Sequence, residues 1–219
     1  MRHNPNWSYR KALVHLCSSE FKGVEPMTKL TRRGALGLAA SVLAFSATAH
    51  AKPAKVPQGW DGKKMYETMI KDGCGFRSAT PANVKKTAHV FFDTQCPDCI
   101  RLMDRILPLQ DRIAVMYYPI ALLNPHCEPQ GALILGSKDP YAALVRHHEH
   151  FRDADFRGLR YEGADLPYEL RNKVWINTKL HRRSGCRAVP YGVYLNSKGE
   201  YVPFDENLTT AELAELFEL

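Results

Sequence analysis

The order of apolar and polar positions along the chain predicts strands that alternate with helices. Residues 89–92 (HVFF) form an apolar run with the β-branched and aromatic content of a buried strand. From Ile100 to Leu107 the apolar positions recur with the period of a helix, and residues 113–120 (IAVMYYPI) form a second buried run. A strand, a crossover helix and another strand indicate a parallel βαβ unit.

The remaining pattern predicts a helical segment followed by a hairpin. Further helices are expected over residues 61–71, 131–136, 140–151 and 166–182 and after Thr209 or Thr210, and strands over residues 191–195 and 200–204. Asp61 is the expected N-cap of the first of these helices, and a turn at residues 196–199 (NSKG) joins the two strands. We therefore expect an α/β domain with a central mixed sheet flanked by helices. A helical insertion at about residues 128–184 separates its βαβ half from a C-terminal ββα half.

Composition changes this picture mainly at the N-terminus. The chain of 219 residues has a formal net charge of +7, but residues 1–51 hold seven Lys and Arg against two Asp and Glu. The rest of the chain is almost balanced in charge and has no basic stripe interleaved with aromatic residues. Nucleic-acid binding is therefore not expected.

Residues 27–51 (MTKLTRRGALGLAASVLAFSATAHA) have the organisation of an export signal. A charged start precedes an apolar stretch at about residues 35–45, and Ala49-His50-Ala51 is a small-residue cleavage site. The apolar stretch is too short to predict a membrane span. Thr31-Arg32-Arg33 resembles a twin-arginine signal, and an ordinary secretory signal fits as well.

This signal sets the expected division of the chain. Because residues 1–26 are polar and aperiodic, we expect translation to start at Met27 and the mature chain to begin at Lys52, outside the cytoplasm, where disulfides are permitted. The expected parts are a leader over residues 1–51, a lead-in with a short helix over 52–85, and the main domain over 86–219.

Two cysteines lie where the first predicted strand is followed by the first predicted helix, in Cys96-Pro97-Asp98-Cys99. Cys96 is expected at the helix cap and Cys99 in the first turn, where free backbone N–H groups and the helix dipole stabilise a thiolate. Pro97 suits the first helical position. The spacing lets one sulfur resolve a mixed disulfide formed by the other, so we interpret the pair as a redox site. Half a zinc site, a structural disulfide and two packed thiols are the alternatives. Against the zinc site, no second CxxC or HxxxH pair stands at finger spacing.

Several segments, in this order, resemble the DsbC/DsbG-like family of periplasmic disulfide isomerases and oxidoreductases, within the thioredoxin superfamily. The matching segments are residues 92–99 (FDTQCPDC), 118–123 (YPIALL), 131–135 (GALIL) with Asp139-Pro140, and 185–190 (GCRAVP). They extend over about residues 86–205. Their order and spacing are more specific than a CxxC motif alone.

The resemblance implies a thioredoxin fold and thiol-disulfide exchange in the periplasm. It implies that Cys96 attacks a substrate disulfide, that Cys99 resolves the mixed disulfide, and that Val189-Pro190 is the family's cis-proline step beside the cysteines. The implied partners are exported proteins with cysteines and a membrane redox protein that resets the dithiol. No organic cofactor and no metal are implied, because the dithiol is the redox group.

The chain departs from the family's pattern at three places. Residues 52–85 are too few for the family's N-terminal dimerisation domain, so a monomer is expected. Val189 stands where the isomerase branch usually has Thr, and Asp98 stands where relatives often have Tyr or His. A carboxylate beside the thiolate is expected to make Cys96 less acidic, and the pair less oxidising, than a histidine at position 98 would.

Three further cysteines of the predicted mature chain, Cys74, Cys127 and Cys186, allow at most one more bridge. A Cys127–Cys186 disulfide would tie the insertion to the cis-proline loop, and Cys74–Cys127 is the competing pair. Cys186 matches an apolar position of the family, so a buried thiol is an equal alternative.

Other polar residues near these motifs have simpler explanations. His147, His148 and His150 suggest a metal site, but only His147 and His150 share a helix face. No thiolate or carboxylate cluster accompanies them, so a solvated helix face is favoured. Asp93 lies close to the dithiol and could transfer a proton to Cys99, although a turn or capping role explains it without such a step.

Two other classes of function remain open. The same groove could belong to a chaperone-like binding or assembly module with an incidental dithiol. Alternatively, Cys96 and Cys99 with a third cysteine could handle a metal ion. Substitution of both cysteines by serine separates binding from exchange, since pure binding would persist.

Overall fold

The computed structural model describes residues 54–162 and 166–219. The predicted leader, with its start at Met27 and its cleavage site after Ala51, lies outside the described residues, as does the predicted first mature residue, Lys52. Within the two described ranges, no helix combines the length and the apolar character needed to cross a membrane.

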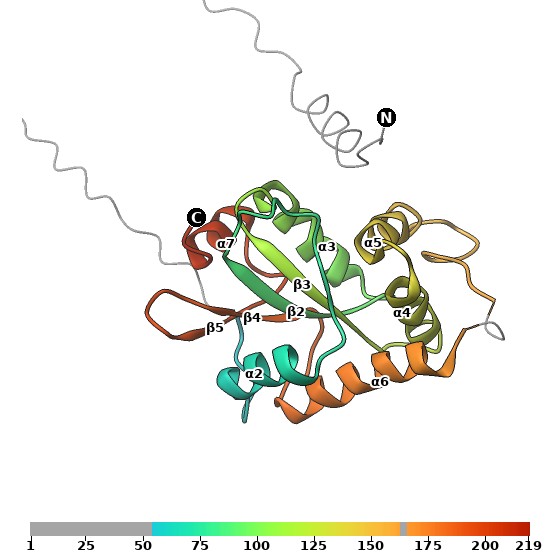
Figure 1. Cartoon of the computed structure of the whole chain (residues 1–219), viewed down its shortest axis with the longest axis horizontal. Coiled ribbons are helices and arrows are strands. Elements are labelled where there is room, and N and C mark those ends of the chain that lie inside the picture. Colours follow the sequence, from blue (N-terminus) through green and yellow to red (C-terminus); the bar gives the residue numbers. More distant parts are fainter. Residues whose placement is uncertain (1–53, 163–165) are drawn as a thin grey trace, which may run out of the picture. The chain divides into compact units, whose positions relative to one another are not determined.

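A mixed five-stranded sheet with the strand order β1-β3-β2-β4-β5 forms the centre of the domain (Figure 1). The strands are β1 (Phe76–Arg77), β2 (Thr87–Asp93), β3 (Ala114–Ile120), β4 (Tyr191–Leu195) and β5 (Tyr201–Phe204). β2 and β3 pair in parallel and the other neighbours pair antiparallel. The predicted βαβ unit and hairpin are both confirmed. The sequence does not predict the edge strand β1, because two residues carry no periodic pattern.

Helices flank the sheet, and α4, α5 and α6 form the predicted insertion between β3 and β4. The helices are α2 (Gly62–Asp72), α3 (Pro97–Ile106), α4 (Cys127–Gly136), α5 (Pro140–Glu149), α6 (Tyr168–Arg183) and α7 (Thr210–Leu216), with a 3-10 turn, η1 (Leu107–Leu109), after α3. α4 begins at Cys127 rather than at the predicted Gly131. Pro129 permits this start, because its missing N–H costs no hydrogen bond in a first helical turn.

The caps and the hairpin turn follow the sequence prediction. The Asp61 carboxylate accepts a hydrogen bond from the Lys64 N–H at 2.9 Å at the start of α2. Thr209 and Glu212 form a capping box at the start of α7. Gly199 ends the β4–β5 turn with a φ of +81°, which a residue with a side chain would adopt only with strain.

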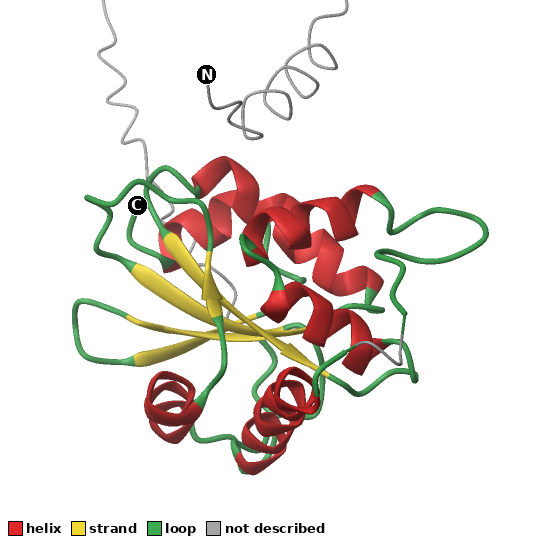
Figure 2. Cartoon of the chain, turned by 45° about the vertical axis from the view of Figure 1, so that its right-hand side comes forward, coloured by secondary structure: helices red, strands yellow, loops and turns green. Residues whose placement is uncertain are grey.

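Alternate residues of β2 are buried on opposite faces of the sheet, as expected for a central strand. Val90 and Phe92 pack in one cluster with side chains of α3 and α7, whereas Phe91 packs in a second cluster with α2 and with Leu180 of α6. Figure 2 shows helices on both sides of the strands. The end of β2 is therefore fixed between two packed layers, and the loop that follows it starts from a rigid strand.

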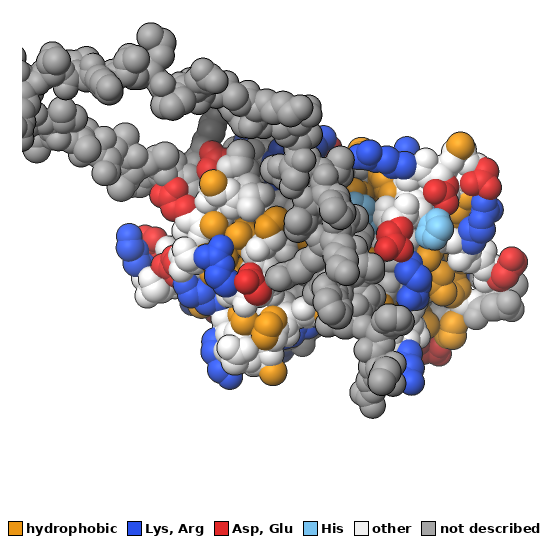
Figure 3. All heavy atoms as spheres, turned by 90° about the horizontal axis from the view of Figure 1, so that it is seen from above, with side chains coloured by type: hydrophobic (Ala, Val, Ile, Leu, Met, Phe, Trp, Pro, Cys, Tyr) orange, Lys and Arg blue, Asp and Glu red, His pale blue; other side chains and the backbone are white. Residues whose placement is uncertain are grey.

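The surface carries charges of both signs. On the face seen in Figure 3, Lys and Arg side chains are interspersed with Asp and Glu and with apolar side chains. This mixed distribution agrees with the near balance of charge in the sequence after residue 51.

Candidate active site

The predicted dithiol lies at the carboxyl end of β2, where α3 begins. Cys96 is the N-cap of α3 with extended backbone (φ −91°, ψ 116°), and Pro97 is the first residue of the helix. Cys99 follows in the first turn, as the sequence predicts. Cys96 is 4% exposed and Cys99 is 1% exposed, so Cys99 is the deeper of the two.

The surroundings of Cys96 favour its thiolate. A hydrogen bond from the Cys99 thiol lowers the pKa of Cys96 most, and the backbone N–H groups of Cys99 and Asp98 lower it further. Burial and the Asp98 carboxylate act in the opposite direction, but the net pKa is below the usual value for a thiol. The Cys96 thiol donates to the Val189 carbonyl, 3.4 Å away.

The surroundings of Cys99 favour its protonated form. Burial raises the pKa of Cys99 well above the usual thiol value, and the interaction with Cys96 and the Asp93 carboxylate raise it further. Its sulfur accepts the Asp93 backbone N–H at 3.4 Å. The two sulfurs are therefore unequal, because Cys96 ionises first while Cys99 keeps its proton and donates it in a hydrogen bond to the thiolate. This arrangement suits an attacking sulfur and a resolving sulfur.

Asp98 lies on the partly exposed side of the first turn of α3. Its carboxylate forms an ion pair with Arg101, 2.5 Å away, and it raises the pKa of Cys96. The direction of this effect is the one that the sequence predicts. Arg101, one helical turn away, neutralises part of the carboxylate charge, so the effect on Cys96 is smaller than that of an unpaired carboxylate.

The loop that precedes β4 lies against Cys96. Its Val189–Pro190 peptide bond is cis, as the resemblance implies, and the Val189 carbonyl is the group that accepts the hydrogen bond from Cys96. On the other side of the loop, Nε2 of His181 in α6 donates to the Ala188 carbonyl at 3.0 Å. His181 thereby holds the residue before Val189.

The turn between β2 and α3 is held by the side chain of its first residue, Asp93. One carboxylate oxygen accepts the Gln95 N–H at 2.9 Å, and the other accepts the N–H groups of Leu122 and Leu123 at 2.8 and 3.1 Å. Asp93 thus joins the active-site turn to the loop after β3. This turn role, foreseen from the sequence, accounts for the burial of the carboxylate.

His147 of α5 holds the same turn from the insertion. Its Nε2 donates to the Thr94 carbonyl at 2.8 Å and its Nδ1 accepts the Leu159 N–H at 3.2 Å. Burial lowers the pKa of His147 to about 4, so the ring is neutral. Gly158 lies so close that a Cβ there would be 2.1 Å from the ring. The solvated position expected for His147 is wrong, because this face of α5 packs on the active-site turn.

A polar network extends this contact. The Gln95 amide donates to Oε1 of Gln130 at 2.7 Å and to the Arg157 carbonyl at 3.1 Å. In return, the Arg157 guanidinium donates to the Gln95 carbonyl at 3.1 Å. The segment after α5 is therefore bound to the turn before Cys96. Sequence reasoning missed Gln95 and Gln130, because their partners are distant in the chain and no local period marks them.

The three other described cysteines are thiols in separate surroundings. Burial raises the pKa of both Cys127 and Cys186 to about 12. The Cys127 sulfur accepts the Asn124 N–H at 3.3 Å, whereas the Cys186 sulfur lies 3.7 Å from that of Met65. Neither the Cys127–Cys186 bridge nor the Cys74–Cys127 bridge is present. Cys127 and Cys186 belong to different packed clusters. Cys186 is instead the buried thiol that was the alternative.

The histidines do not form a metal site with their neighbours. His148 lies 3.3 Å from the Asp104 carboxylate, and the exposed His150 lies 2.8 Å from that of Asp153. Within residues 54–162 and 166–219, no three His, Cys, Asp or Glu side chains are grouped in a way that could hold a metal ion.

Solved structures with a similar fold are thioredoxin-like proteins. The catalytic domain of Proteus mirabilis ScsC matches with a TM-score of 0.53 and 17% identity, and the match covers 72% of this chain and 96% of that one. A periplasmic thioredoxin-like protein from Salmonella enterica serovar Typhimurium matches with a TM-score of 0.52 and 16% identity, over 71% of this chain and 97% of that one. The chain therefore has a thioredoxin-like fold with a helical insertion.

Among proteins of known sequence, the chain is similar to the thiol:disulfide interchange protein DsbG of Pseudomonas aeruginosa. The two are 26% identical over 144 residues, which are 63% of this chain and 52% of DsbG. The chain thus spans about half the length of this relative. No protein-family model matches the chain. The match confirms the resemblance to the DsbC/DsbG-like proteins, and the chain is a homologue of thiol-disulfide exchange proteins.

Proposed function

We propose that this chain is an exported thiol-disulfide oxidoreductase that exchanges disulfides with protein substrates through Cys96 and Cys99. The observation that carries the proposal is the inequality of the two sulfurs, since hydrogen bonds lower the pKa of Cys96 while burial raises that of Cys99. A purely structural pair needs no such difference. The similarity to DsbG supports the same chemistry.

The reaction with an oxidised substrate begins when the Cys96 thiolate attacks one sulfur of a substrate disulfide. The substrate S–S bond breaks, a mixed disulfide with Cys96 forms, and the other substrate sulfur leaves as a thiolate. Cys99 then loses its proton and attacks the Cys96 sulfur, so that the second substrate sulfur leaves and a Cys96–Cys99 disulfide remains. The substrate has gained two electrons from the dithiol, and the reverse sequence oxidises a substrate dithiol.

The cis-proline loop supplies the edge at which the substrate chain lies. Val189 is the residue that contacts Cys96, and an extended substrate segment beside the loop would bring its sulfur to the thiolate. The predicted export signal at residues 27–51 directs this activity to the periplasm. There a membrane redox partner resets the dithiol after each turnover.

A glutathione redox titration of the full chain, with thiol trapping and intact-mass readout, tests the proposal. We expect two thiols to titrate together, to map to Cys96 and Cys99, and to have a potential above about −300 mV, the upper limit for structural disulfides. Cys186→Ser is the matched control and should leave the titration unchanged. A pair that never forms, or that never opens at accessible potentials, would refute exchange and favour a binding module.

A further inference from the structure

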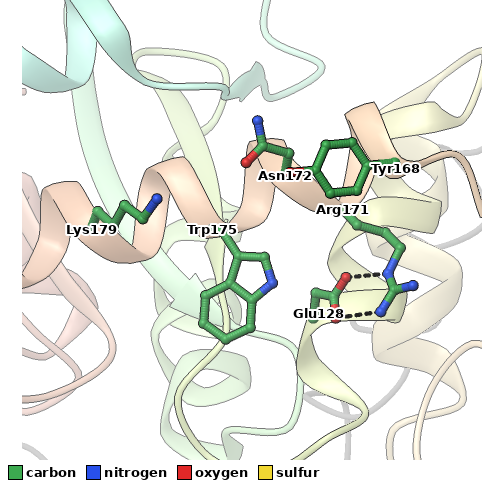
Figure 4. Close-up of a pocket in the computed structure, with 6 residues that line it drawn as sticks. All are labelled: Glu128, Tyr168, Arg171, Asn172, Trp175 and Lys179. Carbon is green, nitrogen blue, oxygen red and sulfur yellow. Dashed lines mark hydrogen bonds and ion pairs between the residues drawn. The ribbon is translucent and has the colours of Figure 1, made fainter.

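A pocket of about 430 Å³ lies between α6 and the start of α4 (Figure 4). Its lining consists of Glu128, Tyr168, Arg171, Asn172, Trp175 and Lys179. All of these except Glu128 belong to α6, and their spacing of three or four residues places them on one face of the helix. No step of the proposed exchange reaction uses this face.

Two aromatic side chains form the apolar part of the pocket. Tyr168 is 75% exposed and Trp175 is 41% exposed, which is unusual for side chains of this size. The packing of α6 does not require them, because its buried face is formed by other residues, Val174 and Thr178 among them. Aromatic side chains that remain exposed in a pocket can lose their water when a partner binds.

The polar part of the pocket mainly offers hydrogen-bond donors. Arg171 binds both carboxylate oxygens of Glu128, as the dashed lines in Figure 4 show, so the acceptor in the lining is occupied. Lys179 makes no ion pair with any residue in the described ranges. Because Arg171 and Glu128 neutralise each other, the charge of Lys179 makes the lining complementary to an anion.

The outer side of α6 extends this positive charge. Lys173, Arg182 and Arg183 are exposed on the same helix, and Glu169 is its exposed carboxylate. Because the chain after residue 51 is almost balanced in charge, this concentration is local. Such a field attracts acidic partners and orients them before contact.

One lining residue of the pocket, Glu128, is linked to the active-site turn through its neighbour in the chain. Glu128 directly follows Cys127, whose carbonyl accepts a hydrogen bond from the Thr94 hydroxyl at 3.4 Å. Thr94 stands two residues before Cys96 in the turn. The link between Glu128 and this turn is buried, because Thr94 is 1% exposed and Cys127 is 0% exposed.

We propose that this pocket binds an acidic segment of the protein substrate. A Glu or Asp carboxylate of that segment is held by Lys179, while Arg171 stays paired with Glu128, and a neighbouring apolar side chain lies between Tyr168 and Trp175. The identity of the partner rests on the proposed function. Because the contact is remote from the reacting sulfurs, it selects substrates and raises their kcat/KM without altering the chemistry at Cys96.

Binding is tested on the full chain with Cys96→Ser and Cys99→Ser, so that exchange cannot contribute. The probes are a labelled, cysteine-free peptide that contains Glu-Phe-Glu and a matched peptide that contains Gln-Phe-Gln, measured by fluorescence anisotropy. Lys179→Glu should weaken binding of the acidic peptide by about tenfold. Lys173→Glu makes the same charge change on α6 outside the pocket and should weaken it less than about twofold. Equal losses in both variants, or equal affinities for both peptides, would overturn the proposal.

Turnover separates this proposal from the exchange function. With Cys96 and Cys99 intact, Lys179→Glu should lower kcat/KM for a peptide disulfide that carries the acidic segment and leave that for a neutral peptide disulfide unchanged. If Lys179→Glu leaves the ratio of kcat/KM between the acidic and the neutral peptide disulfide unchanged, the docking site is refuted and the exchange function is not affected. Absence of exchange with both peptides would overturn the proposed function, and the docking site would then be decided by the binding measurement.

Discussion

Two loops meet at the Cys96 sulfur, and each is held by a buried histidine of the helical insertion. His147 donates to the Thr94 carbonyl at 2.8 Å in the turn before α3, and His181 donates to the Ala188 carbonyl at 3.0 Å in the cis-proline loop. The second ring nitrogens differ. Nδ1 of His147 accepts the Leu159 N–H, whereas Nδ1 of His181 has no hydrogen-bond partner in the described part of the chain.

The difference shows that the insertion restrains the two loops unequally. The turn before α3 is also bound through Gln95 to Gln130 and Arg157, so several side chains fix the position of the sulfur. The hydrogen bond from His181 holds the other loop, and its ring packs edge-on against Phe91 at 5.5 Å between centroids. The cis-proline loop is thus less constrained by side chains than the turn that positions the Cys96 sulfur.

The largest expected effect comes from His147→Phe, which keeps the ring but removes both hydrogen bonds. The Thr94 carbonyl and the Leu159 N–H would be buried without partners, so the free energy of unfolding should fall by about 3 kcal/mol. Urea denaturation measures this, and the exchange rate of Cys96 should fall with it. His150→Phe, at the exposed end of α5, is the control and should cost less than about 0.5 kcal/mol. Similar losses of stability in both variants would show that the hydrogen bonds of His147 do not hold the turn before α3.

The neutral state of His147 predicts a pH dependence. Burial lowers its folded pKa from 6.5 to about 4, so the unfolded chain binds more protons between these pH values. The stabilisation is complete above pH 6.5 and is lost as the pH falls towards 4, by at most about 3 kcal/mol. Asp93, His148 and His150 act more weakly on this pKa.

The control for this pH dependence is His147→Gln, which keeps a donor and an acceptor but does not titrate. Burial also lowers the pKa of His89 to about 4, so both proteins should lose stability in acid. The variant should lose less between about pH 6.5 and 4. Parallel stability curves for the two proteins would show that folding does not lower the pKa of His147.

A smaller effect is expected from His181→Phe. This change leaves the Ala188 carbonyl unpaired but also removes a buried nitrogen that has no partner, so the two effects partly cancel and the loss of stability should be about 1 kcal/mol. If the cis-proline loop binds the substrate chain as proposed, the KM for a protein substrate should rise while the pKa of Cys96 changes little. A loss of stability greater than that of His147→Phe would show that the insertion restrains the cis-proline loop more strongly than the turn before α3.

The sequence predicts the parts of this site that local chemistry determines. The apolar run of β2, the proline after Cys96 and the helical period of α3 are all read within a few residues, so the position of both sulfurs follows. The hydrogen bonds from His147 and His181 to the two loops depend on contacts between distant segments. A buried His147 and an exposed His150 look alike in the sequence of α5, and only the packing of the insertion on the turn distinguishes them.

The smallest predicted effect concerns Asp98, which acts on the sulfur without touching either loop. Its charge raises the pKa of Cys96 but is partly neutralised by Arg101, and its side chain is 38% exposed. Asp98→Asn should therefore lower the pKa of Cys96 by less than about one unit, and Asp98→His should lower it further. Arg101→Gln should raise it, because the carboxylate then loses its counter-charge. The ultraviolet absorbance of the thiolate measures all three shifts. A higher pKa for Cys96 in Asp98→His would contradict the predicted effect of the carboxylate. An unchanged pKa in all three variants would show that the helix N-terminus, rather than the charge at position 98, determines the acidity of the sulfur.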